Sequence, residues 1–148
     1  MSYEVLQNIR KELEQKWEEA FTQDISKSQK RKLGFKQCMW NVFSWEKIKC
    51  LEGTEAADAF DQQKKAGCYL FYSSEEEAIY LPNAKPIKAK NIIHAGSPVE
   101  EEAAIDTKHN IVNSTDKCLV DLYVVDEKFS WTYILTHEED FGPYFYKP

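Results

Sequence analysis

Hydrophobic residues recur every four positions at the start of the chain, and charged residues fill most positions between them. This spacing predicts an amphipathic helix over residues 3–21. The apolar positions are Val5, Ile9, Leu13, Trp17 and Phe21. A second, shorter helix is expected from residue 26, because Ser26 and Gln29 fit a capping box.

Two more helices are expected before residue 67. Apolar residues at helical spacing in "FKQCMWNVF", residues 35–43, predict a helix with a wide buried face. Residues 52–66 predict another helix, which begins near Glu52–Thr54 and is ended by Gly67, since glycine commonly follows the last turn of a helix. The first 66 residues are therefore predicted to be mainly helical.

The hydrophobic pattern changes to that of β-strands after Gly67. The segment "CYLFYSSEEEAIYLP" predicts two strands joined by a polar turn, and residues 119–125 and 130–136 predict a hairpin with the turn "DEKF". Residues 130–136 carry large side chains on both faces, so we expect a central strand. The ending "FGPYFYKP" predicts a turn followed by a tail that docks on the domain.

These elements predict a single α+β domain over residues 1–148. Helices from a mainly helical half, residues 1–66, are expected to pack on one antiparallel sheet of about four strands. The sheet comes from a mainly β half, residues 67–148, which contains an irregular connector near residues 83–117. The length of 148 residues fits one domain with its own hydrophobic core.

Charge is unevenly distributed along the chain, whose net charge is −6. Basic side chains outnumber acidic ones in residues 1–50, whereas acidic side chains outnumber basic ones two to one in residues 51–148. An acidic surface repels phosphate, so we expect no nucleic-acid partner and favour a basic protein partner. The basic run of residues 27–36 is interpreted as a solvated helix face, with phosphate or an acidic partner as the alternative.

No stretch of the sequence indicates a membrane protein. Apolar runs are far shorter than the roughly 20 residues of a membrane helix, and the charged N-terminus does not resemble a signal peptide. We therefore expect a cytoplasmic protein. Its cysteines, Cys38, Cys50, Cys68 and Cys118, form no CxxC pair and are predicted to be small buried residues rather than disulfide partners or metal ligands. No cofactor is expected.

The candidate catalytic chemistry lies at His137. The sequence contains no nucleotide-binding, metalloprotease or serine-hydrolase motif, which favours a protein that is not an enzyme. His137 follows a strong predicted strand and precedes Glu138, and a histidine beside carboxylates suits acid–base catalysis or one half of a metal site. The competing interpretation is that His137 and Glu138 satisfy backbone groups where the strand ends.

Three blocks of sequence carry a family resemblance: "MWNVFSWEKIKCLEGTEAADAF", "CYLFY" and "DLYVVDEKFSWTYILTHEEDFGPYF". With them the chain resembles a family of small proteins, found largely in Bacillus-type bacteria, that is described as a domain of unknown function, DUF4275. The family has no assigned activity or site, so the resemblance implies only a recurring polar set. Its members here are Glu46, Glu52, Asp126, His137 and Glu138.

Three functional hypotheses follow. The favoured one is a non-catalytic binding module that acts as an immunity-type or regulatory partner of another protein. The second is a metal-dependent or acid–base hydrolase that uses His137 with Glu138 and a carboxylate such as Glu46 or Glu52. The third is a small-ligand pocket between sheet and helices. Its expected lining is Trp40, Trp45, Tyr72 and Trp131.

Overall fold

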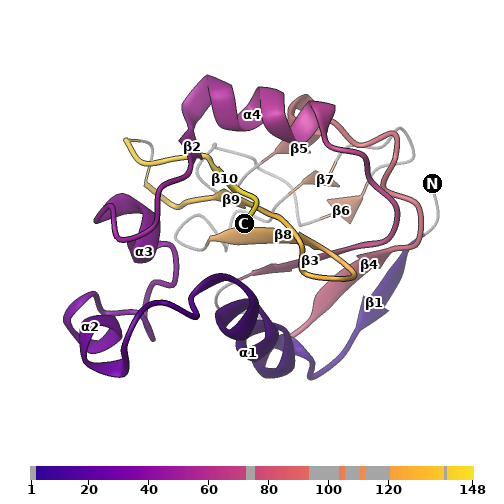
Figure 1. The fold of residues 1–148 in the computed structure, drawn as a ribbon. Helices are drawn as coiled ribbons and strands as arrows, with labels where there is room; N and C mark the ends of the chain where they lie inside the picture. The colour runs from indigo at the N-terminus through magenta and orange to yellow at the C-terminus, as the bar shows by residue number, and fades with distance from the viewer. Residues whose placement is uncertain (1–2, 73–75, 94–103, 106–110, 113–120, 139) are drawn as a thin grey trace.

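A computed structural model describes residues 3–72, 76–93, 104–105, 111–112, 121–138 and 140–148. Its centre is a seven-stranded sheet in which every neighbouring pair is antiparallel (Figure 1). In spatial order the strands are β1 (Glu4–Leu6), β4 (Ala78–Leu81), β3 (Cys68–Tyr72), β8 (Leu122–Asp126), β9 (Thr132–Leu135), β10 (Tyr144–Tyr146) and β2 (Leu51–Glu52). The α+β class is confirmed, but the sheet is larger than the expected four strands.

Helices cover both faces of this sheet (Figure 1). One face carries α1 (Arg10–Phe21) and α3 (Asn41–Ser44), and the other carries α4 (Gly53–Gln62). The short α2 (Lys27–Lys32) has no buried residue and lies below α3, away from the strands. A 3-10 turn, η1 (Ala89–Asn91), leads into a small second sheet of β5 (Ile92–Ile93), β7 (Ile111–Val112) and β6 (Ala104–Ile105). In the described part of the chain, no helix has the length and apolar character needed to cross a membrane.

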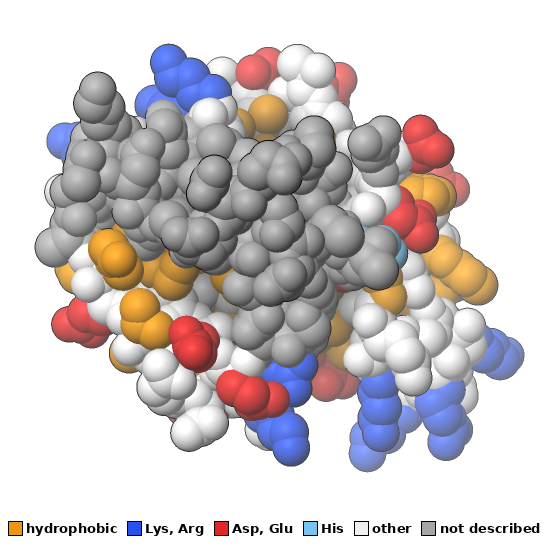
Figure 2. Space-filling view, turned by 180° about the vertical axis from the view of Figure 1, so that it is seen from behind, with side chains coloured by type: hydrophobic (Ala, Val, Ile, Leu, Met, Phe, Trp, Pro, Cys, Tyr) orange, Lys and Arg blue, Asp and Glu red, His pale blue; other side chains and the backbone are white. Residues whose placement is uncertain are grey.

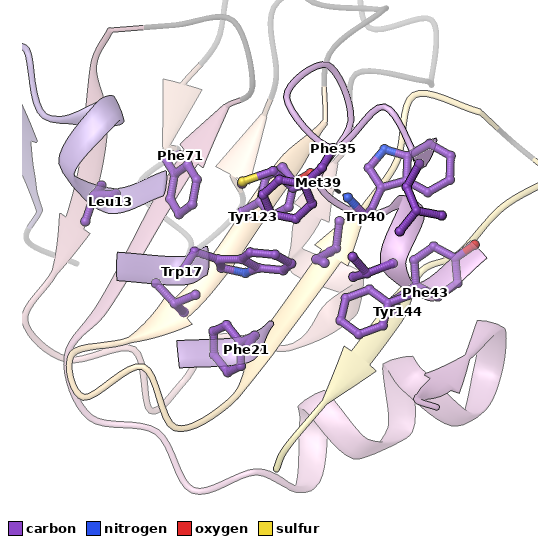
Figure 3. Close-up of a cluster of buried hydrophobic side chains, with 14 of the residues drawn as sticks. Leu13, Trp17, Phe21, Phe35, Met39, Trp40, Phe43, Phe71, Tyr123 and Tyr144 are labelled. Carbon is purple, nitrogen blue, oxygen red and sulfur yellow. Dashed lines mark hydrogen bonds between the residues drawn. The ribbon is translucent and has the colours of Figure 1, made fainter. Parts of the chain in front are cut away.

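The alternation of side chains along the strands produces two hydrophobic clusters, one on each face. In β8, Leu122 and Val124 pack with Phe60 of α4, whereas Tyr123 and Val125 pack with Trp17 of α1. Figure 3 shows the cluster on the α1 side. It includes Leu13, Trp17, Phe21, Phe35, Met39, Trp40, Phe43, Phe71, Tyr123 and Tyr144. Because β8 and β9 are covered on both faces, the prediction of a central strand is confirmed.

The first helix is shorter than its sequence pattern predicts. Residues 4–6 form β1, which pairs with β4 at Val5 and Ile79, and α1 begins only at Arg10. Asn8 between them has a left-handed backbone (φ 55°), a conformation that asparagine adopts more readily than most residues. The apolar positions of a short edge strand matched the helical spacing by chance, so this part of the prediction was wrong.

Two other helix predictions also needed shortening. Residues 35–40 form turns, and only Asn41–Ser44 is helical, after Gly34 has taken a left-handed backbone (φ 66°). The helix after Gly53 ends at Gln62 rather than beside Gly67. The capping box of α2 is confirmed, because the Ser26 side chain accepts from the Gln29 amide and the Gln29 side chain accepts from the Ser26 amide.

Two short segments of the predicted mainly helical half also join the sheet. β1 forms one edge of it, and β2 forms the other by pairing with β10, so Leu51 faces Phe145 and Glu52 faces Tyr144. The docked tail is therefore confirmed as a strand inserted between β9 and β2. Much of the connector near residues 83–117 and Cys118 lie outside the described residues, while Cys38, Cys50 and Cys68 are free thiols.

Candidate functional site

Two separate groups of polar residues are candidates for a functional site. The first is an acidic hollow of about 620 Å³, which includes the carboxylates of Glu46, Glu52 and Glu55. Its other lining residues are Phe43, Ile48, Lys49 and Cys50. Three carboxylates against one lysine give this hollow a negative charge. We call these seven residues the acidic hollow.

The backbone brings the three carboxylates of the acidic hollow together from different elements. Glu46 follows α3 in a left-handed conformation (φ 57°), which turns the chain back toward β2. Glu52 ends β2, and Gly53 then makes a sharp turn (φ 62°) that starts α4. Glu55 lies in the first turn of α4, where the helix dipole favours an acid.

Trp45 and Leu51 directly precede two of these carboxylates in the chain, and both are exposed. The relative exposure of Trp45 is 58% and that of Leu51 is 41%. Tryptophan is enriched among the residues that contribute most to binding at interfaces, so the exposed Trp45 is a candidate contact residue. Burial raises the pKa of the neighbouring Cys50 thiol to about 12, with a further contribution from Glu52. Cys50 is therefore a neutral thiol and not a ready nucleophile.

The second group is an aspartate–histidine pair at the end of β9. Asp121 is only 2% exposed, and one of its carboxylate oxygens lies 2.8 Å from both the backbone nitrogen and the Nδ1 of His137. A carboxylate accepts hydrogen bonds, so this geometry places a proton on Nδ1, and in the neutral tautomer of the ring Nε2 is then the acceptor. Asp121 thus fixes both the orientation and the tautomer of His137.

The surroundings of His137 restrain it further. Its Nε2 lies 3.6 Å from Oε1 of Glu138, and its ring meets Trp40 edge-on with 6.0 Å between centroids. The Thr136 hydroxyl lies within hydrogen-bond distance of the carbonyl oxygens of Glu138 and Phe141, which fixes the turn that holds the histidine. Figure 2 shows histidine surface next to acidic and hydrophobic surface on this face.

Two further groups beside this pair bear on its chemistry. The indole N–H of Trp40 is buried and has no hydrogen-bond partner among the residues that the structure describes. Burial, with smaller contributions from Asp121 and Glu138, raises the pKa of the Cys38 thiol to about 12. Cys38 is therefore a neutral thiol, which does not suit a cysteine nucleophile activated by His137.

The five polar residues singled out from the sequence separate into three places. Glu46 and Glu52 share the acidic hollow, and His137 and Glu138 are neighbours at the end of β9. Tyr144 is buried, and this burial raises the pKa of its hydroxyl, with a further contribution from Glu52 and a smaller one from Glu138.

Asp126 lies apart from these pairs and shapes the turn between β8 and β9. Its carboxylate accepts hydrogen bonds from the Ser130 amide (2.7 Å), the Ser130 hydroxyl (2.5 Å) and the Trp131 amide (3.2 Å). These bonds satisfy the backbone donors of the tight loop that joins the two strands. The structure therefore gives Asp126 a role in turn formation.

The four aromatic residues considered for a ligand pocket do not line a common cavity. Trp40 packs in the cluster on the α1 side, whereas Tyr72 and Trp131 pack in the cluster on the α4 side. Trp131 stacks on Phe145 with 5.9 Å between centroids, and Trp45 is exposed. The sheet itself separates Trp40 from Tyr72 and Trp131, so core packing explains the burial of these three residues.

Asp121 and Glu55 are the two site residues that the sequence alone did not single out. Asp121 directly precedes β8, and the register of the hairpin pairs Leu122 with Leu135, which brings the residue before one strand close to the residues after the other. That register was the available signal. Glu55 offered none beyond its place in the first turn of a helix. In the described part of the chain, no group of three or more His, Cys, Asp or Glu could hold a metal ion.

Comparison with known proteins gives one match. The model of the family described as "Domain of unknown function (DUF4275)" matches residues 3–145. No curated protein and no solved structure shows significant similarity to the chain. Because the match covers nearly the whole sequence, including both polar groups, the chain belongs to the DUF4275 family.

Proposed function

We propose that this chain is a non-catalytic interaction module that binds a basic segment of another cytoplasmic protein at the acidic hollow. The carrying observation is a hollow with three carboxylates, one of which directly follows the exposed Trp45 in the chain. Tryptophan contributes more binding energy at interfaces than most residues, and its ring also attracts Lys and Arg side chains. As an immunity-type or regulatory partner, the chain would use this surface to contact basic side chains of the other protein.

The charge of the hollow supports this choice of partner. Glu46, Glu52 and Glu55 face only Lys49 within the lining, so the surface keeps a negative charge that complements a basic segment. Much of the apolar surface of Trp45 and Leu51 remains in contact with water, because each side chain is exposed by more than 40%. A partner that covers them would remove that area from water, which favours association.

Charge-neutral substitution tests the proposal. The partner is captured from cells that carry the gene, identified, purified and titrated against wild-type chain and the Glu46→Gln/Glu52→Gln/Glu55→Gln variant. We expect the triple variant to bind at least tenfold more weakly, as does Trp45→Ala, while both keep the wild-type unfolding temperature. A matched control, Glu4→Gln/Asp24→Asn/Glu77→Gln, removes the same charge at exposed positions elsewhere and is expected to bind normally.

Three outcomes would contradict the proposal. One is a purified partner that binds the triple variant and the wild type equally well. Another is the absence of any partner whose binding can be reproduced with purified proteins. Equal losses in the triple variant and in the control would also count against it, because they would show a general effect of net charge rather than a local contact.

A second candidate function, acid–base hydrolysis, is favoured by the Asp121–His137 pair. A buried carboxylate that holds Nδ1 leaves Nε2 able to take a proton from water, which is the role of a general base. The indole N–H of the neighbouring Trp40 has no partner among the described residues, and a bound ligand can satisfy such a donor. This candidate predicts that His137→Gln abolishes hydrolysis of p-nitrophenyl acetate or p-nitrophenyl phosphate while the protein remains folded.

The hydrolase candidate is tested with and without added Zn²⁺ or Mn²⁺, so that metal-dependent hydrolysis is covered. Asp121→Asn keeps the shape of the pair but holds the His137 ring less firmly. It is expected to lower kcat and to leave KM nearly unchanged. Hydrolysis that survives in His137→Gln, or no hydrolysis of either ester under any of these conditions, would rule against this function.

A further inference from the structure

Basic residues near the start of the chain line a second hollow, which is separate from the acidic hollow. It measures about 640 Å³, within the range of small-molecule pockets. Its basic residues are Lys27, Lys30 and Arg31 of α2 and Lys36 of the following turn. Figure 2 shows Lys and Arg side chains gathered at the lower right, where α2 lies after the half-turn from Figure 1. We call these four residues the basic cluster.

The cations of the basic cluster are mostly unpaired. Glu18 is the one carboxylate in the lining, and it pairs with Lys30 at 2.8 Å. Among the described residues, no carboxylate lies within ion-pair distance of Lys27, Arg31 or Lys36. Like charges gathered around one concavity repel one another, and an anion bound between them would relieve that repulsion.

The helix dipole does not explain this arrangement. Lys30 and Arg31 lie in the last turn of α2, where cations are favourable. Lys27, however, is the first residue of α2, where a positive charge opposes the dipole, and Lys36 lies beyond the helix. The dipole therefore accounts for Lys30 and Arg31 but not for Lys27 and Lys36, which line the same hollow.

The lining of the hollow indicates what kind of anion would bind there. Gly34 and Phe35 contribute to the lining, and the hollow continues along α1 into a smaller one of about 220 Å³ that shares Glu18, Phe35 and Lys36. Arg31 presents a planar fork that suits phosphate oxygens, while the lysines act as point charges from two separate segments. Cations from two segments suit a ligand with several charges.

We propose that the basic cluster binds a small ligand that carries two or more phosphate groups. The phosphates lie between Lys27 and Arg31 on one side and Lys36 on the other, and the remainder of the ligand extends along the groove beside α1. The site is independent of the proposed partner surface, because the two hollows share no residue. The net charge of −6 opposes nonspecific uptake of anions, so binding at this place requires local cations.

Titration calorimetry with inorganic tripolyphosphate tests the proposal on the full chain. We expect saturable binding that weakens with added salt, and at least a tenfold loss of affinity in Lys27→Gln/Arg31→Gln/Lys36→Gln. All three side chains are exposed, so the fold is expected to survive, which circular dichroism checks. The control Lys64→Gln/Lys85→Gln/Lys128→Gln removes the same charge at exposed positions outside the basic cluster and should bind like the wild type.

A second probe separates a phosphate ligand from an acidic protein segment. Hexaglutamate carries several negative charges but no phosphate. If hexaglutamate binds and tripolyphosphate does not, the proposal is overturned and the basic cluster is a docking site for an acidic peptide. The proposal also fails if tripolyphosphate does not bind the wild type, or if the triple variant and the control lose the same affinity.

Discussion

Thr132 connects the first helix to the centre of the sheet. Its Oγ1 accepts a hydrogen bond from the indole N–H of Trp17 at 3.0 Å and donates one to the Val124 carbonyl oxygen at 3.1 Å. Both Trp17 and Thr132 are completely buried. The Thr132 hydroxyl of β9 is therefore the partner of the only polar atom in the Trp17 side chain of α1.

Thr132→Val tests this connection because it keeps the shape of the side chain and removes the hydroxyl. We expect the free energy of unfolding to fall by about 1–3 kcal/mol, since the Trp17 indole N–H would remain buried without a partner. Urea unfolding measures the change. In a Trp17→Phe background the same substitution should cost less, and equal costs in both backgrounds would contradict the argument.

Glu14 predicts a dependence of stability on pH. Burial raises the pKa of its carboxyl above 4.5, Glu76 adds to the rise, and Arg10 and Lys11 oppose it. The folded state then holds the proton more tightly than the unfolded state, so the contribution of Glu14 is most favourable below the unfolded pKa. That contribution is lost as pH rises through the folded pKa.

We therefore expect Glu14→Gln to increase the free energy of unfolding at about pH 7 and to leave it nearly unchanged at about pH 3.5. Urea titrations at the two pH values measure the difference. Glu19→Gln removes the same charge from an exposed position of the same helix and is the control. A gain for Glu14→Gln that is equal at both pH values would contradict the assignment.

At the scale of elements, Lys27 of α2 is expected to lower the stability of the fold while it contributes to the proposed phosphate binding. Lys27 begins this helix, where the dipole favours a negative charge. Lys27→Glu is expected to raise the free energy of unfolding by about 0.3–1 kcal/mol at low salt and to weaken tripolyphosphate binding at least tenfold. Thermal unfolding and calorimetry on the same variant measure both effects. A variant that is less stable, or that binds as well as the wild type, would refute this account.

The elements also show what sequence patterns predict and where they stop. The hairpin of β8 and β9 and the cap of α2 depend on neighbouring residues, so periodicity and capping chemistry identified them. β1 and β2 depend on pairing with distant strands, β4 and β10, and two or three residues carry no period of their own. The edges of the sheet were therefore missed while its centre was predicted.

Part of the candidate site could likewise be predicted from the sequence, and part of it could not. His137 and Glu138 stand together in the sequence, so their proximity could be predicted, and a strand end was the signal. Asp121 required the register of the hairpin, and the grouping of Glu46, Glu52 and Glu55 required the left-handed turns at Glu46 and Gly53. Such contacts depend on backbone conformations that no local pattern specifies.

At the scale of the whole molecule, β10 is the element that joins the two halves of the chain. It pairs with β9 on one side and with β2 on the other. Its successive side chains also reach both clusters, since Tyr144 packs on the α1 side and Phe145 on the α4 side. The strand thus completes both cores as well as the sheet, and the acidic hollow is built on the β2 that it holds in place.

Removal of residues 144–148 is accordingly expected to abolish cooperative folding. Loss of one buried aromatic side chain costs about 3–5 kcal/mol, and a domain of this kind has about 5–15 kcal/mol in total. Circular dichroism during heating measures the transition, and the control deletes only residues 147 and 148, both exposed. The control should stay within about 0.5 kcal/mol of the wild type. If the longer deletion kept a sharp transition near the wild-type temperature, β10 would be a peripheral strand, and β2 with its carboxylates would have to be held by α3 and α4 alone.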